Sequence, residues 1–207
     1  MKGFILKLNS AKNEDMIVKV LTSNSINSYY RFYGARHSVL QLGYLIDFEV
    51  QESSNNFLPR IRNITHHGFK WLYNREKLMD WHRFIKILEE HLRDVSHIDS
   101  FYFNLLLDSA KKWERQSSKR VAVEAFVNIL KYEGTLHNLS KCLICGKRIE
   151  NNLSLIKGFI PAHNFCANSK TLPFKEIKEL FTNNTSMFID DETIELLFEI
   201  MAKGFNN

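Results

Sequence analysis

The chain lacks the features that mark membrane proteins and proteins of oxidising compartments. No run of residues approaches the ~20 consecutive apolar residues that a membrane span needs. The partly apolar stretch at residues 1–6 has neither the length of a signal-peptide core nor a small-residue cleavage site. There are only three cysteines, which cannot all pair, so they suit a reducing compartment better than a disulfide framework. We therefore expect a cytoplasmic protein.

The sequence also lacks the motifs of common enzymes. It contains no G-x-x-x-x-G-K-[S/T] loop for nucleotides, no G-x-S-x-G elbow, and no H-x-E ahead of P-C-x-x-C. The eight histidines are scattered, and none forms the H-E-x-x-H pair of a zinc protease. We expect no enzymatic activity.

What is present indicates an ordinary globular protein with a basic balance. The 207 residues are 44% hydrophobic and 25% charged, enough for one large core or two small ones. The formal net charge is +5, and its excess lies in the first two thirds of the chain. This balance favours an anionic partner such as nucleic acid, although many proteins without one are equally basic.

All three cysteines fall in one segment with a histidine in register. Cys142 and Cys145 are separated by two residues, as are His163 and Cys166, and seventeen residues lie between the two pairs. This is the spacing of a zinc knuckle pair, with Gly146 placed to let the first knuckle turn back. We predict a structural Zn²⁺ held by these four ligands, with no open position for water or substrate. The alternative is three free, buried cysteines and a surface histidine.

Up to residue 67 the chain alternates apolar and polar residues in short runs, which predicts five strands. The strands are expected at residues 2–8, 15–22, 26–33, 44–51 and 57–65. Five short strands with a longer excursion after the third describe a small Greek-key barrel such as an OB-fold. An SH3-like barrel fits the periodicity nearly as well.

From residue 69 apolar residues recur at helical spacing. We expect a long amphipathic helix containing residues 78–95, a second at 99–114, and a third from 119 to a stop at Gly134. A hairpin strand is expected at 153–159, a short helix from Pro173 to 181 and a last helix at 190–203. The chain is thus predicted to be α+β, with a barrel domain at 1–68 and a helical domain at 69–207 that includes a zinc-binding segment at 138–170.

The order of these motifs resembles the bacterial recombination mediator RecO. The resemblance depends on Gly34-Ala35-Arg36-His37-Ser38 after the third strand, on a helix carrying Glu124, Phe126 and Leu130 before Gly134, and on Cys142-x-x-Cys145-Gly146. It covers nearly the whole chain. It implies an N-terminal OB-fold, a helical domain and a zinc-binding insertion.

The resemblance also implies a function in DNA repair and homologous recombination. RecO proteins bind single- and double-stranded DNA, anneal complementary strands and help to load RecA together with RecR. They also bind the acidic C-terminal tail of single-stranded-DNA-binding protein, through a hydrophobic pocket with basic neighbours in the helical domain. A nucleoid-associated location in the cytoplasm follows.

Two departures from the family pattern are visible. The family loop after the third strand usually reads K-G-A-R-R, whereas here Tyr33 precedes the glycine and His37 follows the arginine, so only Arg36 carries over as a basic contact. Many members have four cysteine ligands, whereas here His163 occupies the third ligand position.

Aromatic and basic residues of the third strand are the first candidates for contacting DNA. Tyr29, Arg31 and Tyr33 alternate onto one side of the strand, while Tyr30 and Phe32 take the other. A cation between two aromatic rings suits a single strand, whose phosphates and bases it would contact together. The alternative is that one or both tyrosines of the first set complete the core and Arg31 is merely solvated.

Further candidates extend a basic track. Arg36 lies in a glycine-containing turn, where the backbone can approach a phosphate closely. Arg60 and Arg62 share a face of the fifth strand and would extend the same track, or they could simply form a solvated face. A charge run between the second and third helices could line a path for DNA or hold an acidic peptide, or could simply be a solvated helix end. It consists of Lys111, Lys112, Arg115, Lys119 and Arg120. Lys2, Lys7 and Lys19 are weaker candidates.

Two other functions compete with DNA binding. The first is an adaptor whose barrel binds protein and whose basic run holds an acidic peptide. The second is a zinc-dependent hydrolase of nucleic acid, in which only three residues bind the metal and one position stays open.

Overall fold

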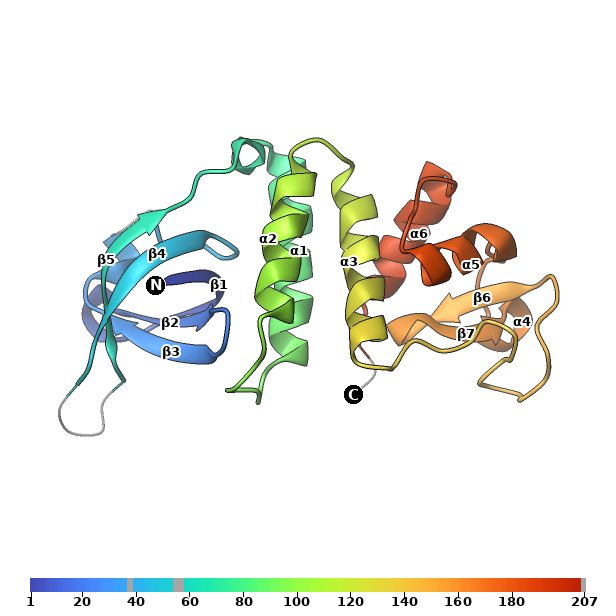
Figure 1. Cartoon of the computed structure of the whole chain (residues 1–207), viewed down its shortest axis with the longest axis horizontal. Coiled ribbons are helices and arrows are strands. Elements are labelled where there is room, and N and C mark those ends of the chain that lie inside the picture. Colours follow the sequence, from blue (N-terminus) through green and yellow to red (C-terminus); the bar gives the residue numbers. More distant parts are fainter. Residues whose placement is uncertain (37–38, 54–57, 206–207) are drawn as a thin grey trace. The chain divides into compact units, whose positions relative to one another are not determined.

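The computed structural model describes residues 1–36, 39–53 and 58–205 of the chain. The chain divides into two compact units, Met1–Arg115 and Gln116–Asn207. The first contains a β-barrel and two long helices, and the second contains helices around a small hairpin (Figure 1). The α+β class is confirmed. The predicted change from strands to helices near residue 68 falls inside the first unit, because the first two long helices pack with the barrel.

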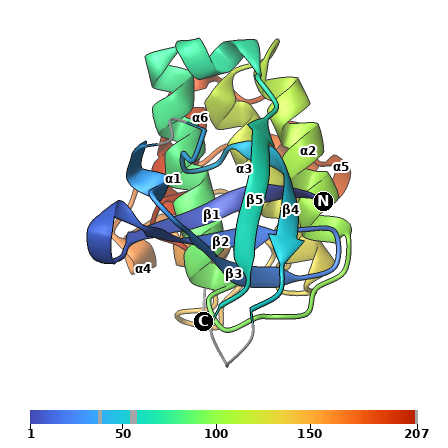
Figure 2. The same ribbon diagram turned by 90° about the vertical axis from the view of Figure 1, so that its left-hand side faces the viewer.

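Five strands close into the barrel in the order β1-β2-β3-β5-β4, with β4 returning to pair with β1. The strands are β1 Lys2–Ser10, β2 Met16–Leu21, β3 Ile26–Arg31, β4 Leu45–Gln51 and β5 Arg60–His66. All neighbours run antiparallel except β3 and β5, which are parallel and meet at Tyr30 and Arg60. Figure 2 looks onto this barrel, with β4 and β5 crossing the other strands. The predicted OB-fold is confirmed, although Phe57, expected in the fifth strand, lies outside the described residues.

Short single-turn helices and turns connect the strands. The first, η1, is Lys12–Glu14 between β1 and β2, and the second, η2, is Gly34–Arg36 after β3. The interior is filled by apolar side chains of the barrel strands and of the segment before β4. It consists of Ile5, Val18, Val20, Tyr29, Leu40, Ile46, Phe48 and Ile61.

Two long helices of the first unit pack against β1. After the turn η3 Lys70–Tyr73 come α1 Arg75–His91 and α2 Phe101–Trp113. Asn74 caps α1 by accepting a hydrogen bond from the Lys77 backbone at 3.1 Å. Trp81 of α1 is fully buried, and its ring nitrogen donates to the Gly43 carbonyl at 2.9 Å. Its ring also lies 5.0 Å from that of Trp113 of α2, so one aromatic cluster holds both helices to the barrel.

The second unit is built on α3, Ser118–Tyr132, which ends before Gly134 at a φ of +70°. The remaining elements are β6 Leu153–Ile156, η4 Lys157–Phe159, β7 Ile160–His163, α4 Asn164–Ala167, α5 Phe174–Asn183 and α6 Asp191–Met201. The hairpin β6-β7, α5 and α6 lie beside α3 (Figure 1), with Phe126 of α3 against Phe159 at 4.9 Å. Among the helices of the described ranges, none is long and apolar enough to cross a membrane.

Candidate nucleic-acid interface and metal centre

The third strand presents to solvent the face opposite to the one predicted. Tyr29 is only 3% exposed, and its ring meets Phe48 edge-on at 5.5 Å inside the barrel. Tyr29 therefore completes the core, which was the alternative interpretation of the sequence. Tyr30 and Phe32 lie on the outer surface instead. Aromatic residues on both faces of the strand left the choice of face open to sequence reasoning.

These two outward rings belong to a groove of about 430 Å³ on the outside of the barrel. Its other lining residues are Ile17, Leu58 and Arg60. The Arg60 guanidinium lies 4.8 Å from the centre of the Phe32 ring, a cation–π contact. The groove thus combines apolar ring surface with one cation, which the sequence could not reveal because it depends on the parallel pairing of β3 with β5.

Asp15 orients the edge of this groove. Its carboxylate accepts a hydrogen bond from the Tyr30 hydroxyl and another, at 2.7 Å, from the Tyr33 backbone N–H. The hydrogen bond to Asp15 raises the pKa of the Tyr30 hydroxyl, with burial as a smaller cause. The Tyr30 ring is therefore held in place as a neutral phenol.

The other candidates of the third strand and the following turn are already engaged. Arg31 is half-buried and donates to the Ile61 carbonyl at 3.2 Å. Tyr33 has left the strand with a φ of +50° and is exposed, with the Arg36 guanidinium 5.3 Å from its ring centre. Arg36 also forms an ion pair with Glu14. Both side chains of that pair are largely exposed, 65% and 50%, and such pairs contribute only ~0–1 kcal/mol, so a phosphate can compete for Arg36.

Arg60 and Arg62 share the outer face of β5, since Ile61 between them is buried. Arg62 is exposed and forms no ion pair within the part of the chain that the structure describes. In contrast, Lys7 and Lys19 both approach the buried carboxylate of Glu89 on α1, at 3.3 and 3.1 Å. These two lysines hold α1 to the barrel.

The predicted charge run divides between the two units. Lys111, Lys112 and Arg115 are exposed at the end of α2, where Lys111 pairs with Asp108 at 3.5 Å. Lys119 and Arg120 begin α3 in the second unit. Lys119 forms an ion pair with Glu195 of α6.

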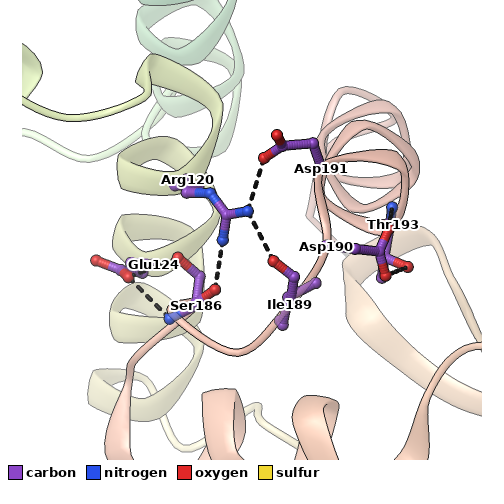
Figure 3. Close-up of polar contacts among 7 residues, drawn as sticks. All are labelled: Arg120, Glu124, Ser186, Ile189, Asp190, Asp191 and Thr193. Atoms are coloured by element: carbon purple, nitrogen blue, oxygen red, sulfur yellow. Dashed lines mark hydrogen bonds and ion pairs between the residues drawn. The ribbon is translucent and has the colours of Figure 1, made fainter.

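Arg120 is a structural clamp (Figure 3). Its guanidinium donates to the carbonyls of Ser186 and Ile189 and pairs with Asp191 at 2.7 Å. One turn along α3, Glu124 accepts hydrogen bonds from the Ser186 backbone and hydroxyl at 2.9 and 2.8 Å. Together the two side chains fasten the loop before α6 to α3.

Replacing Arg120 by alanine should therefore cost stability rather than DNA affinity. Two carbonyls would lose a charged donor, and we expect the free energy of unfolding to fall by about 2–3 kcal/mol in urea denaturation. Lys119→Ala, which removes a partly exposed ion pair, should cost less than about 1 kcal/mol. Equal stability of the two variants would contradict the clamp.

The four predicted ligands converge in the second unit. The sulfurs of Cys142, Cys145 and Cys166 and a ring nitrogen of His163 all lie within 4.8 Å of one another. The Nδ1 atom of His163 is 3.4 Å from the Cys145 sulfur and 3.7 Å from that of Cys166. This group could hold a metal ion, and four protein ligands would complete a tetrahedron around it.

Local structure explains the convergence. The first knuckle turns at Gly146, with a φ of +75°, and its N–H donates to the Cys142 carbonyl at 2.9 Å. His163 ends β7 and Cys166 follows on the single turn of α4. The Nε2 atom of His163 is 3.0 Å from the Arg148 carbonyl, which can only accept. Nε2 therefore carries the proton, and Nδ1 offers its lone pair to the site.

The thiols are electrostatically unequal. Burial raises the pKa of Cys142, but the backbone N–H groups of Cys145, His163 and Ile144 outweigh it and lower the pKa to about 6. Burial, followed by the neighbouring Cys145 and Cys142 sulfurs, raises the pKa of Cys166 to about 11. The site thus favours a thiolate at Cys142 and disfavours one at Cys166, and a bound cation would relieve the cost at Cys166.

The second unit also carries a groove of about 510 Å³ between the segment after α3 and helix α5. Its apolar lining includes Leu136, Phe174 and Phe181, and its polar lining includes His137 and Lys178. Sequence reasoning assigned no residues to such a pocket, because they come from two segments about forty residues apart.

Comparison with known proteins bears on the barrel. Residues 1–72 match the family model described as RecO N terminal, and a search of the curated proteins finds no match. The matched stretch contains all five barrel strands and reaches into η3. It covers about a third of the chain. The N-terminal barrel domain is therefore similar to that of RecO proteins.

Proposed function

We propose that this protein is a non-enzymatic mediator of DNA repair and homologous recombination, whose barrel binds single-stranded and double-stranded DNA. The match to the RecO N-terminal family supports a role in repair and recombination. The observation that carries DNA contact is the groove on the barrel, where Tyr30, Phe32 and Arg60 are presented outward together.

The groove has the chemistry that a single strand requires. Stacking of a base on an aromatic ring contributes ~1–3 kcal/mol and tolerates any sequence. Phe32, partly exposed beneath the Arg60 guanidinium, offers such a ring, and Arg62 on the same strand face offers a cation to the next phosphate. Arg36 would join the track by exchanging Glu14 for phosphate.

Annealing would follow from neutralising two phosphate backbones on one protein, which needs positive surface rather than bond-making residues. No ATP is required for this. Loading of RecA together with RecR belongs to the same proposal through the family.

We further propose Zn²⁺ as the ion of the Cys142, Cys145, His163 and Cys166 site. Three thiolates and one imidazole whose ligand atoms lie within 4.8 Å of one another are a donor set that zinc takes in structural sites. When bound, the ion would tie the first knuckle to the end of the hairpin.

The groove beside α5 is our candidate for the acidic tail of single-stranded-DNA-binding protein. Leu136, Phe174 and Phe181 would receive an apolar side chain, and Lys178 a carboxylate. Lys131 lies at the same rim, since its ammonium donates to the carbonyl of the lining residue Thr182 at 3.1 Å.

Charge reversal at Arg60 and Arg62 tests the barrel interface. In the Arg60→Glu/Arg62→Glu variant, affinity for a labelled single strand at low salt should fall at least 30-fold, roughly the loss of two phosphate contacts and one stacking platform. Fluorescence anisotropy measures this directly. The Lys70→Glu/Arg75→Glu variant is the control, since it makes the same charge change at exposed positions on η3 and α1. Its affinity for the single strand should fall much less.

The same variants separate the proposal from its rivals. A protein-binding adaptor would keep its partner and show no DNA affinity to lose. A zinc hydrolase would cleave nucleic acid and need an open metal position, whereas four side chains surround this site.

A further inference from the structure

The charge of the second unit is strongly segregated along the chain. Residues 141–175, which contain the metal ligands, carry six Lys and Arg against the single acid Glu150. Residues 176–207, which contain all of α5 except its first two residues and the whole of α6, carry two Lys against seven Asp and Glu. Three thiolates with one divalent ion would add only one negative charge to the first segment. The segment with the candidate metal ligands is therefore basic, with Lys141, Lys147 and Arg148 in the first knuckle, whereas the segment after it is acidic.

The knuckle also exposes apolar side chains. Leu143 and Ile144, between the first two cysteines, are 45% and 52% exposed, and Phe165, beside Cys166, is 67% exposed. The four ligand atoms lie within 4.8 Å of one another, so these two tips border the same site. Apolar surface and basic surface thus occur on one small structure.

Phe165 is held as an open platform. Its ring stacks on the imidazole of His163 with centres 4.8 Å apart and planes within 8°. One face is therefore covered by the His163 imidazole, whose Nε2 atom lies 3.0 Å from the Arg148 carbonyl, and the large exposure leaves the other face to solvent. In the same knuckle as this carbonyl, Lys141, Lys147 and Arg148 are exposed and form no ion pair within the described ranges.

We propose that this knuckle surface is a second contact for single-stranded nucleic acid, with a base stacked on Phe165 and phosphates on Lys141, Lys147 and Arg148. It deepens the proposed function, since annealing needs two strands held by one protein. The fixed ring with one open face favours a base over an acidic peptide, because any base can stack on it without further groups.

The test uses the full chain and oligothymidylate, both with the native barrel and with Arg60→Glu/Arg62→Glu. Phe165→Ala and Lys147→Glu should each weaken binding about fivefold or more in the barrel-deficient background. Phe188→Ala and Lys203→Glu, at exposed positions elsewhere in the second unit, should leave it unchanged. Zinc content and urea unfolding establish that the knuckle variants remain folded.

The outcomes separate this inference from the barrel proposal. If Arg60→Glu/Arg62→Glu alone abolishes binding, and Phe165→Ala and Lys147→Glu have no effect in the native barrel, the knuckle contact is wrong and the barrel proposal stands. If the knuckle variants weaken oligothymidylate binding and the barrel variant has no effect, the knuckle contact is supported and DNA binding by the barrel is wrong. The folded knuckle variants are also compared for binding to a peptide that contains aspartate and phenylalanine. If they keep their affinity for oligothymidylate but lose affinity for this peptide, the knuckle surface binds a protein partner and the inference is wrong.

Discussion

Replacing Cys145 by serine should remove the metal and unfold the knuckle of the second unit. Binding of zinc to Cys and His sites of this kind is worth ~10–16 kcal/mol in isolated fingers, and most of it appears as folding free energy. The segment from Cys142 to Cys145 lies outside the regular helices and strands, and hydrogen bonds from the Leu143 N–H to the Pro161 carbonyl at 3.0 Å and from the His163 N–H to the Cys142 sulfur at 3.4 Å join it to the hairpin. We expect the free energy of unfolding of the second unit to fall by several kcal/mol.

The measurement combines elemental analysis with urea unfolding of the wild type, the Cys145→Ser variant and a chelated sample. Asn151→Ser, an exposed change in the same segment, is the matched control and should retain metal and stability. Chelated protein as stable as the untreated protein would rule out a structural role for the ion. Loss of a nuclease activity with stability intact would instead support the hydrolase alternative.

Replacing Gly43 by alanine should separate the helices from the barrel. A methyl group there would lie 2.4 Å from the Trp81 ring nitrogen and 2.6 Å from its neighbouring carbon, and the φ of +76° disfavours any side chain. Trp81 cannot move aside, because it is fully buried between Trp71 and Trp113. Overpacking and backbone strain together should cost about 3 kcal/mol or more.

Gly68→Ala is the matched control, since no atom lies within 4 Å of its added methyl group and its φ is ordinary. Urea unfolding followed by tryptophan fluorescence reports directly on the Trp81 cluster. Similar midpoints for the two alanine variants would show that the close packing at Gly43 does not hold the first unit together.

Local patterns in the sequence predicted most of the fold. The alternation of residues 2–8 and the helical spacing from Leu78 onward depend on near neighbours, and the structure has a strand and a helix there. The grouping of Cys142, Cys145, His163 and Cys166 was predictable for a related reason, since the two residues of each pair are only three positions apart.

What the sequence could not predict depends on distant partners. Arg120 reads as one member of a basic run, but its hydrogen-bond partners lie 66 and 69 residues further along the chain. Likewise, the alternation in the third strand gave two aromatic faces, and only closure of the barrel around Tyr29 decides that Tyr30 and Phe32 face outward. The roles of these side chains therefore depend on contacts between residues that are far apart in the sequence, which the sequence alone does not reveal.

The most direct test of the barrel as a DNA-binding surface is the salt dependence of single-strand binding by the wild type and by Arg60→Glu/Arg62→Glu. Each phosphate contact contributes about −0.7 to the slope of log K against log salt for single strands. The wild type should bind at low salt with a slope of about −2 or steeper, and the variant should be shallower by more than one. If the wild type did not bind at low salt, or if the wild type and the variant had equal slopes, the barrel would not be the DNA-binding surface.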